Sequence, residues 1–370
     1  MKIVVAADSF KGTMSSTEVC DIIARAIKDF DDWIEVVTVP IADGGEGTVD
    51  AFLSAAGGKR IYTKVKDPLM RDVQACFGLL SDGETAVVEM AQASGIGHVA
   101  NELKPMEATT YGTGQLIKSA LDAGCKKIIL GLGGSATTDG GAGAAAALGV
   151  KFLTKNNKEI PLGGGGLEFL ADIDTSGLDP RLKDTEIILA CDVDNRLCGR
   201  QGAAAVFGPQ KGATPEEVKI LDRNLSHYAR VLKAKLGIDV TGIKGGGAAG
   251  GLSVSMIAFA NARIMPGIQV VLETVRFSEI IKHADMVITG EGRIDSQTVM
   301  GKVPVGVARA CRGRGIPVVA IGGSLGPGYE AVYDEGISSV FSVVNDLAPF
   351  ETVKATCRHD LYMLIKNLFR

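Results

Sequence analysis

Apolar residues follow two alternating patterns in the first part of the chain. The stretch from Lys2 to Ala7 is apolar throughout after its first residue, which is typical of a strand buried on both faces of a parallel sheet. Beyond it, apolar residues recur at helical spacing from Val19 to Phe30, and Ser15 with Glu18 three residues later predicts a capping box. A second strand at 34–41 and a second helix repeat this order. The alternation of strand and helix predicts a doubly wound parallel sheet.

The pattern changes after Lys59. Strands are predicted at 60–66, 73–80 and 85–90, and an Asp-Pro and an Asp-Gly turn between them favour antiparallel hairpins. Later in the chain a long helix is predicted at 215–236, because a capping box precedes it and a glycine follows its last apolar position. The four glycines at 163–166 predict a surface turn or a lid over a site.

The alternation of strand and helix returns after Asp285. Strands are predicted at 286–289, 317–321 and 338–344, with helices between them and a closing helix after Pro349. Together with the first two strands they predict one five-stranded parallel sheet, which a long insertion interrupts in the sequence.

The chain is therefore predicted to fold as two α/β domains. One is discontinuous, residues 1–60 plus 280–370, and the other is inserted, residues 61–279. If the strand order of the first is flavodoxin-like, its first and third strands flank the switch point, where ligands usually bind. The loops expected there, 8–11 and 290–295, carry charged side chains, which favours a ligand site at this point.

Composition narrows the class of protein. The chain has 370 residues, 46% of them hydrophobic and 22% charged, which is typical of a well-buried globular protein rather than a disordered one. Its formal net charge of −4, without long basic runs, argues against a nucleic-acid-binding surface. The uncharged run 245–262 is too rich in glycine for a membrane span and is interpreted as a loop and a buried helix. The apolar run that precedes Asp8 has only five residues, too few for the core of a signal peptide.

The seven cysteines are scattered and form no CxxC pair or metal-ligand spacing. We therefore expect reduced thiols and a cytoplasmic protein. The oligomeric state has no signature in the sequence.

The stretch Gly131 to Gly143, GLGGSATTDGGAG, follows an apolar strand and precedes an alanine-rich helix. Glycines let bare backbone N–H groups approach a ligand, hydroxyls add donors, and the start of a helix favours an anion. A phosphate cradle is one interpretation, and a tightly packed strand-to-helix turn is the other. In the first interpretation the nucleotide-binding residues are Gly133, Gly134, Ser135, Thr137 and Thr138.

Two other enzyme classes have weaker signals. Gly131, Gly133 and Ala136 fit a loose dinucleotide fingerprint, but the acidic residue that should follow is at best Glu159, in a polar turn. A serine hydrolase would use Ser324 in Gly-Gly-Ser-Leu-Gly, with Asp346 and His359 after it. Its weakness is that His359 falls within a predicted helix. The other histidines form no cluster and are interpreted as structural or solvated.

Several carboxylates lie just past predicted strand ends, and they are Asp8, Asp43, Glu46, Asp192, Asp194, Glu291 and Asp295. A single acid at such a place usually caps a helix or satisfies a turn, but seven beside glycine loops favour chemistry. With Lys11 and Arg293 they meet the needs of phosphoryl transfer: carboxylates for Mg²⁺, cations for the migrating phosphate, and an acceptor for the hydroxyl proton.

Seven motifs in order resemble those of the bacterial glycerate kinases of the first type. They are DSFKG at 8–12, ADGGEGT at 42–48, GLGGSATTDGGAG at 131–143, CDVDN at 191–195, FGPQKGA at 207–213, GGGAAGG at 245–251 and GEGRIDSQT at 290–298. The resemblance runs over essentially the whole chain. It implies ATP-dependent phosphorylation of D-glycerate, with 2-phosphoglycerate the favoured product and 3-phosphoglycerate the alternative. It also implies a flavodoxin-like domain interrupted by an α/β domain that resembles restriction endonucleases.

The residue roles are inferred from residue type and position. We expect Mg²⁺ on Asp192, with Asp43 as a weaker metal candidate that could also act in catalysis. Ser9, Lys11 and Arg293 are expected to bind the substrate, with Lys11 also acting on the phosphate and Asp295 accepting the hydroxyl proton. ATP is then a co-substrate, and the partners are small molecules rather than nucleic acid or membrane. A nucleotide-binding regulatory module without turnover is the alternative.

Overall fold

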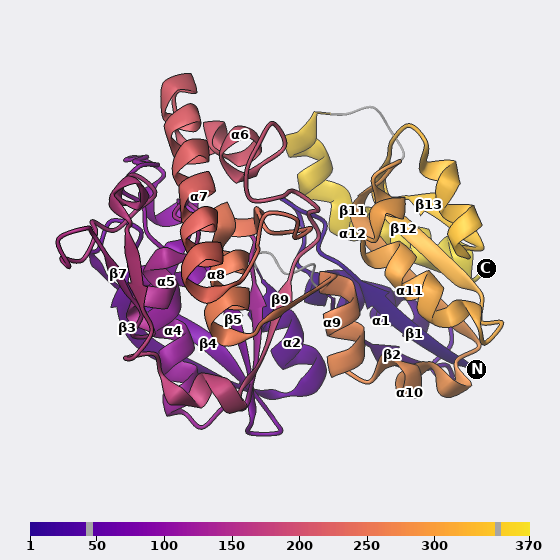
Figure 1. Cartoon of the computed structure of the whole chain (residues 1–370). Helices are drawn as coiled ribbons and strands as arrows, with labels where there is room; N and C mark the ends of the chain where they lie inside the picture. Colours follow the sequence, from indigo (N-terminus) through magenta and orange to yellow (C-terminus); the bar gives the residue numbers. More distant parts are fainter. Residues whose placement is uncertain (42–46, 345–348) are drawn as a thin grey trace. The chain divides into compact units, whose positions relative to one another are not determined.

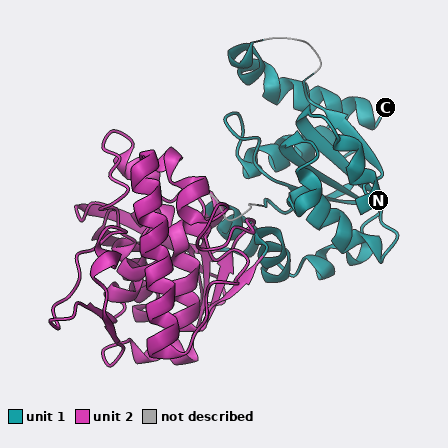
Figure 2. Ribbon diagram, turned by 45° about the horizontal axis from the view of Figure 1, so that its top comes forward, with its two compact units in different colours: residues 1–43, 50–57, 266–370 teal, residues 44–49, 58–265 magenta. Residues whose placement is uncertain are grey.

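The computed structural model describes residues 1–41, 47–344 and 349–370. The chain divides into two compact units (Figure 2). Unit 1 comprises Met1–Asp43, Asp50–Gly57 and Pro266–Arg370, and unit 2 comprises Gly44–Val49 and Gly58–Met265. The main junctions lie earlier in the chain than the predicted 60/61 and 279/280. The reason is that residue 58 already pairs in the sheet of unit 2, whereas the helix after Pro266 packs in unit 1.

Unit 1 is built on a five-stranded sheet in which every strand is parallel to its neighbours (Figure 1). Its strands are β1 Lys2–Ala7, β2 Glu35–Thr38, β11 Met286–Ile294, β12 Val318–Leu325 and β13 Ser339–Ser342. Numbered along the chain within this sheet, their spatial order is 2-1-3-4-5. The first and third strands, β1 and β11, are therefore hydrogen-bonded neighbours whose connections run in opposite directions across the sheet.

The helices around this sheet are α1 Ser16–Lys28, α9 Gly267–Thr274, α10 Phe277–Ile280, α11 Val303–Arg312 and α12 Phe350–Leu368, and α2 Thr48–Ala56 spans one junction between the units. The predicted capping box of α1 is confirmed: Ser15 Oγ accepts from the Glu18 amide, and the Glu18 carboxylate accepts from the Ser15 amide. The buried face of α1 packs with β1 and α12 into one apolar core. These local signals and their burial fix the frame that holds the strand ends.

Strands β11 and β12 extend well past the other strands at their carboxyl ends. Pairing of β1 with β11 ends at Gly290, whereas β11 and β12 remain paired to Ile294 and Leu325. The prediction of a loop at 290–295 is therefore wrong for most of its length. Glycines make this extension possible, because a Cβ atom at Gly323 would lie 2.6 Å from the Gly292 carbonyl oxygen.

Unit 2 contains a six-stranded mixed sheet of order β10-β9-β6-β5-β4-β3. The strands are β3 Gly58–Lys66, β4 Asp72–Leu80, β5 Thr85–Glu89, β6 Lys127–Gly131, β9 Glu186–Ala190 and β10 Arg263–Met265, and a separate pair is β7 Lys151–Leu153 and β8 Asp172–Asp174. The predicted hairpins are confirmed, because β3, β4 and β5 pair antiparallel. From β5 to β10 the pairing is parallel, so the carboxyl ends of β5, β6, β9 and β10 lie at one edge.

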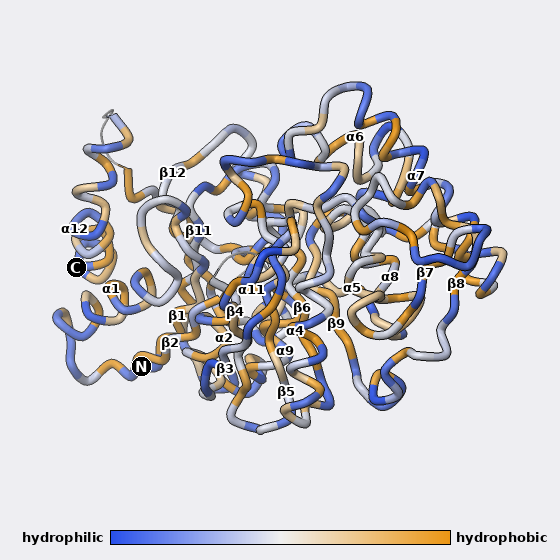
Figure 3. Tube along the Cα trace, turned by 90° about the vertical axis from the view of Figure 1, so that its left-hand side faces the viewer, coloured by the Kyte–Doolittle hydropathy of each residue, from blue (hydrophilic) through white to orange (hydrophobic). Residues whose placement is uncertain are grey.

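The helices of unit 2 are α3 Ala91–Ser94, α4 Tyr111–Asp122, α5 Ala142–Ala147, α6 Ala203–Phe207, α7 Pro215–Leu236 and α8 Leu252–Ala260. Helix α7 has the predicted bounds, with a capping box at Thr214 and Glu217 and a left-handed Gly237 after its last turn. One apolar core contains the sheet, α4 and α8, and the other contains the buried face of α7. In Figure 3 the apolar residues follow the central strands β5, β6 and β9.

Glycines 163–166 are not the predicted surface turn or lid. Gly163, Gly164 and Gly166 are buried. A Cβ atom at Gly164 would lie 2.4 Å from the Thr138 carbonyl oxygen, and Asn224 of α7 donates to the Gly164 carbonyl at 3.0 Å. This glycine run is a packing element that lets α7 approach the Gly131–Gly143 loop.

Candidate functional site

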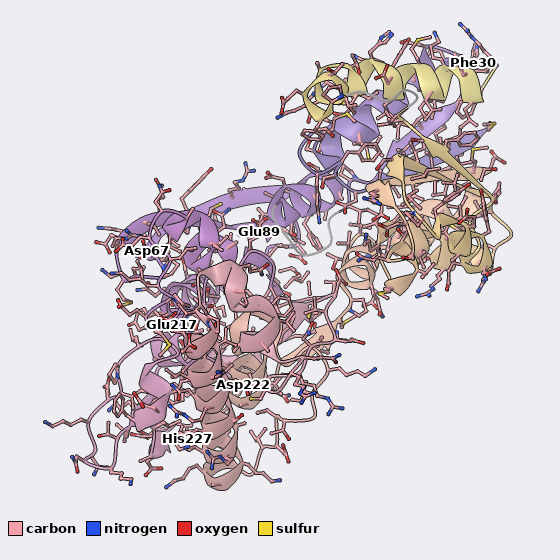
Figure 4. All side chains as sticks on the ribbon, turned by 90° about the horizontal axis from the view of Figure 1, so that it is seen from above. Phe30, Asp67, Glu89, Glu217, Asp222 and His227 are labelled. Carbon is pink, nitrogen blue, oxygen red and sulfur yellow. The ribbon has the colours of Figure 1, made fainter. Side chains whose placement is uncertain are left out.

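The parallel strands of unit 2 bring two predicted motifs to one edge of the sheet, beside Glu89 at the end of β5. In the register of the sheet, Glu89 at the end of β5 is paired with Gly131 at the end of β6, and Gly131 is paired with Ala190 at the end of β9. Glu89, labelled in Figure 4, is buried and accepts a hydrogen bond from the Val49 amide at 2.7 Å. The Gly131–Gly143 loop and the segment after Ala190 therefore start side by side. This is the edge at which α/β sheets usually bind ligands.

The Gly131–Gly143 loop has an accessible part and a buried part. Gly134 is exposed, and Gly133 and Ser135 are half-buried. Thr137 and Thr138 are fully buried, and neither hydroxyl has a hydrogen-bond partner among the described residues. Of the five residues predicted to bind a nucleotide, three thus lie where a ligand can reach them, and the two threonines lie behind them.

Asp139 occupies the helix start that was expected to favour a bound anion. Its carboxylate accepts hydrogen bonds from the amides of Gly141, Gly143 and Thr110 and from the hydroxyls of Thr109 and Thr110, at 2.8–3.3 Å. The Ala144 amide donates to Thr110 Oγ1 at 2.9 Å. The expectation that the start of α5 is open to a ligand is therefore wrong, because the protein's own carboxylate and hydroxyl take its N–H groups.

The glycine loop 245–251 packs behind the Gly131–Gly143 loop. A Cβ atom at Gly250 would lie 1.9 Å from the Thr137 carbonyl oxygen, and the Gly140 amide donates to the Gly250 carbonyl at 2.9 Å. At its other end the Gly247 amide donates to the Asn195 carbonyl at 2.8 Å. All seven residues of this loop are buried. Its glycines serve close backbone packing, and this loop joins two of the predicted motifs.

Lys211 was not predicted, although its motif FGPQKGA was part of the family resemblance. It ends the 3₁₀ turn Pro209–Lys211, is 2% exposed, and donates to Ser135 Oγ at 2.8 Å and to the Thr137 carbonyl at 2.6 Å. Burial lowers the pKa of its ammonium to about 7, and the negative charge of Asp139 opposes this shift only in part. The signal that could have found Lys211 is a lone cation inside an otherwise uncharged and glycine-rich motif.

The surroundings of the candidate metal ligands are less well defined than those of Lys211. Asp192 is exposed in the segment after β9, while Asp194 pairs with Lys244 at 3.9 Å. Asp43 and Glu46 lie outside the described residues. Among the residues that the structure describes, no group of three His, Cys, Asp or Glu side chains is arranged to hold a metal ion. Mg²⁺ usually uses only one or two carboxylates together with water and substrate phosphates, so the donor chemistry of Asp192 fits it.

The remaining predicted residues lie in unit 1, at the ends of β1 and β11. Arg293 is exposed, and its Nε lies 3.3 Å from Asp295 Oδ2. The backbone of Lys11 approaches β11 closely, because a Cβ atom at Gly292 would lie 3.2 Å from the Lys11 nitrogen. Ser9 follows β1 directly, and its amide donates to Asp8 Oδ1 at 2.6 Å. The structure thus brings Lys11 and the Arg293 strand together, and it pairs Arg293 with Asp295.

Glu291 belongs to the same strand end but has a different environment. It is 5% exposed, accepts a hydrogen bond from Thr298 Oγ1, and lies 3.7 Å from Lys302 Nζ. Burial raises the pKa of the Glu291 carboxyl, an effect that Thr298 and Lys302 oppose. Among the described residues, the cation that pairs with Glu291 is Lys302, whereas Arg293 pairs with Asp295.

The structure contradicts the serine-hydrolase interpretation. Ser324 lies within β12, paired in register with Arg293, and a nucleophile elbow requires a sharp turn at that position. His359 is exposed on α12, and Asp346 lies outside the described residues. The dinucleotide fingerprint also lacks its context, because Glu159 is exposed beside the β7 hairpin and not at a strand end of the large sheet.

Two further expectations concern cysteines and membranes. All seven cysteines are free thiols, as predicted. Among the helices that the structure describes, none combines the length and the apolar character needed to span a bilayer.

These features define a two-unit α/β protein with a glycine-rich loop at the strand ends of one sheet and charged strand ends on the other. The Glycerate kinase family matches residues 3–370, and the chain belongs to this family. It is 49% identical to a glycerate kinase of Bacillus subtilis, over 95% of this chain and 92% of that protein. It is 47% identical to the glycerate 2-kinase of Escherichia coli, again over 95% of this chain and 92% of that protein.

A solved structure agrees with this assignment. The crystal structure of a Salmonella typhimurium protein, provisionally named glycerate kinase 2, superposes with a TM-score of 0.90 at 43% identity. The match covers 100% of this chain and 97% of that one. The predicted family membership is therefore confirmed, and the fold is that of a solved relative.

Proposed function

We propose that this protein is a glycerate kinase, which transfers the terminal phosphoryl group of ATP to a hydroxyl of D-glycerate. The observation that carries the proposal is the family match from residue 3 to residue 370, at nearly half identity to curated glycerate kinases. The site adds support, since an accessible glycine loop, an exposed carboxylate and a cation-bearing strand end are the groups that phosphoryl transfer uses.

ATP is bound through the accessible part of the Gly131–Gly143 loop. The backbone N–H groups of Gly133 and Gly134 and the hydroxyl of Ser135 are the donors offered to the phosphates. Thr137 and Thr138 support this segment from behind, since both are fully buried. Asp192 would hold Mg²⁺, which supplies charge neutralisation on the phosphates when it is bound.

Glycerate is bound at the strand ends of unit 1. The guanidinium of Arg293 can bind the glycerate carboxylate, Ser9 can donate to it, and Lys11 places a positive charge near the transferred phosphate. Asp295 accepts the proton of the reacting hydroxyl while the new O–P bond forms and the bond from the terminal phosphorus to ADP breaks. The 3.3 Å contact with Arg293 orients the Asp295 carboxylate for this role.

Position 2 of glycerate is the proposed acceptor, in line with the name glycerate 2-kinase of the Escherichia coli relative. The fold proposed with this function is a flavodoxin-like unit 1, in view of the strand order 2-1-3-4-5, interrupted by unit 2 as an inserted domain. A cytoplasmic location belongs to the same proposal, because phosphorylation by ATP takes place there.

The test is a coupled ADP-release assay with D-glycerate, L-glycerate and glycolate. We expect ADP formation that depends on D-glycerate and on Mg²⁺. Phosphorus NMR of the product then identifies the phosphorylated hydroxyl. If none of the three acids promotes ADP release while ATP still binds, the protein is a nucleotide-binding module without turnover, and the proposal is wrong.

A further inference from the structure

Lys211 is a buried cation that has no carboxylate partner among the described residues. Lysine is almost never fully buried unless it is paired, because removing an ammonium ion from water costs several kcal/mol or more. Here the two partners of Nζ are neutral, the Ser135 hydroxyl and the Thr137 carbonyl. Within the described part of the chain, Lys211 forms no ion pair. Asp139, the nearby acid, is occupied by five donors of its own loop and helix starts.

We propose that Lys211 is the anion-binding cation of the Gly131–Gly143 loop, where it fixes Ser135 and supplies positive charge to a phosphate group bound at Gly133–Ser135. This inference rests on the proposed function, in which a phosphoanhydride chain is the ligand, and it names a residue that binds it.

The geometry favours a ligand over a purely structural role. An ammonium has three N–H donors, and the structure gives partners for two of them. The hydroxyls of Thr137 and Thr138, at the same point of the loop, are buried without hydrogen-bond partners in the described residues. Both of the neutral acceptors of Nζ belong to the loop that reaches the surface at Gly134. A phosphate there would meet unused donors and an uncompensated positive charge.

The charges around Lys211 leave its protonation open to control by a ligand. Asp139 is the only charged residue of the Gly131–Gly143 loop, and helix α6, which packs on the turn of Lys211, has none. On α7, burial raises the pKa of Tyr228 above its usual range, so it stays neutral. Leu103 packs on Gly212, and its neighbours Glu102 and Lys104 pair with each other at 2.9 Å. An anion at Ser135 would therefore add to the partial effect of Asp139 in favouring the ammonium form.

The experiment uses inorganic tripolyphosphate, which contains the phosphoanhydride chain but no adenine. Its dissociation constant is measured by calorimetry for the parent and for Lys211→Met, which keeps the length of the side chain and removes its charge. Lys219→Met is the matched control, since Lys219 is exposed on α7. We expect at least a tenfold weaker binding for Lys211→Met and an unchanged constant for the control. Equal binding by Lys211→Met and the parent would overturn the inference.

A second measurement separates charge from packing and also applies if Lys211→Met fails to fold. With a pKa of about 7 in the free protein, Lys211 is mostly neutral at pH 8.5, so binding that requires the ammonium weakens up to about thirtyfold between pH 6 and pH 8.5. In Lys211→Arg the cation cannot lose its proton. The part of the weakening with pH that comes from Lys211 in the parent should therefore be absent in this variant. A parent whose binding does not weaken with pH relative to Lys211→Arg would contradict the inference.

This test is independent of turnover. If the parent binds tripolyphosphate through Lys211 but releases no ADP with glycerate, the proposed function fails and the inference about Lys211 stands. If the parent phosphorylates glycerate and Lys211→Met binds tripolyphosphate normally, only the inference fails.

Discussion

Replacement of Asp139 by asparagine is the sharpest perturbation of the glycine loop. The Asp139 carboxylate is fully buried and accepts from Gly141 on Oδ1 and from four further donors on Oδ2. Those donors belong to the segments that begin α4 and α5. One side chain therefore holds two helix starts against the loop. Asparagine has the same shape but offers a donor where aspartate offers a second acceptor.

The cost can be estimated from these contacts. The amide oxygen of asparagine is expected to take the Oδ2 position, which keeps four hydrogen bonds and turns the NH₂ group toward the Gly141 amide. Two unpaired donors then face each other, at a cost of about 1–3 kcal/mol. The four remaining bonds lose their charge assistance, while the relief of a buried charge offsets part of that loss. We therefore expect Asp139→Asn to lower the free energy of unfolding by roughly 2–4 kcal/mol. Each kcal/mol corresponds to a decrease of about 2–4 °C in Tm.

The assay is thermal unfolding of the full chain at neutral pH, with Thr109→Val as the matched control. The control removes one donor to Asp139, at 3.2 Å, together with the acceptor of the Tyr111 amide, and should cost only about 1 kcal/mol. The apparent ATP constant of Asp139→Asn should rise as well, because the loop that carries Ser135 loses its anchor. A Tm within one degree of the parent, with an unchanged ATP constant, would refute the argument that Asp139 organises this loop.

Three more predictions concern single side chains. Arg293→Lys should raise the glycerate constant about tenfold to a hundredfold and leave the ATP constant nearly unchanged, because a bidentate contact is lost; steady-state kinetics would contradict this if only the ATP constant moved. Asp192→Asn should shift the Mg²⁺ titration of activity and lower turnover by orders of magnitude, and an overlay with the parent would exclude Asp192 as a ligand. Glu291→Gln should raise Tm at pH 8 but not at pH 4: burial raises the folded-state pKa of Glu291, so its contribution to stability is retained below the unfolded pKa and lost as pH rises through the folded value. A Tm difference that is equal at both pH values would contradict that reasoning.

The sequence predicted those elements whose signals are local. The capping boxes of α1 and α7 are complete within four residues each, and both helices begin where these boxes predict. The prediction of a loop at 290–295 was wrong because the conformation of this segment depends on pairing with β12, a strand that comes later in the chain. In the sequence, glycines such as Gly292 and Gly323 favour a loop, but in the sheet they allow the backbones of β11 and β12 to approach closely. Pairing between distant strands has no local signature.

For the candidate site, the sequence predicted the loop but neither the burial of its side chains nor the cation beside it. The Gly131–Gly143 loop was identified, yet the sequence could not tell that Ser135 is accessible while Thr137 is buried, because both are small hydroxyl residues in the same run. Gly134→Val removes the exposed glycine of this loop and is the obvious probe of it. Gly134 has a φ of +72°, however, so a β-branched residue there is strained, and the substitution would confuse folding with binding. Ser135→Ala is the cleaner probe of the same segment.

Glycine-rich loops in this protein serve two purposes. The atoms that surround each glycine show which of the two it serves. Gly250 and Gly134 both have positive φ, but a Cβ atom at Gly250 would meet the Thr137 backbone at 1.9 Å, whereas one at Gly134 would meet only the Ala91 side chain at 3.2 Å. The first glycine permits packing, and the second faces the surface beside Ser135 and, behind it, Lys211. Because a buried cation is costly unless something compensates it, the residue that carries the proposed ligand site in unit 2 is this lysine rather than any glycine.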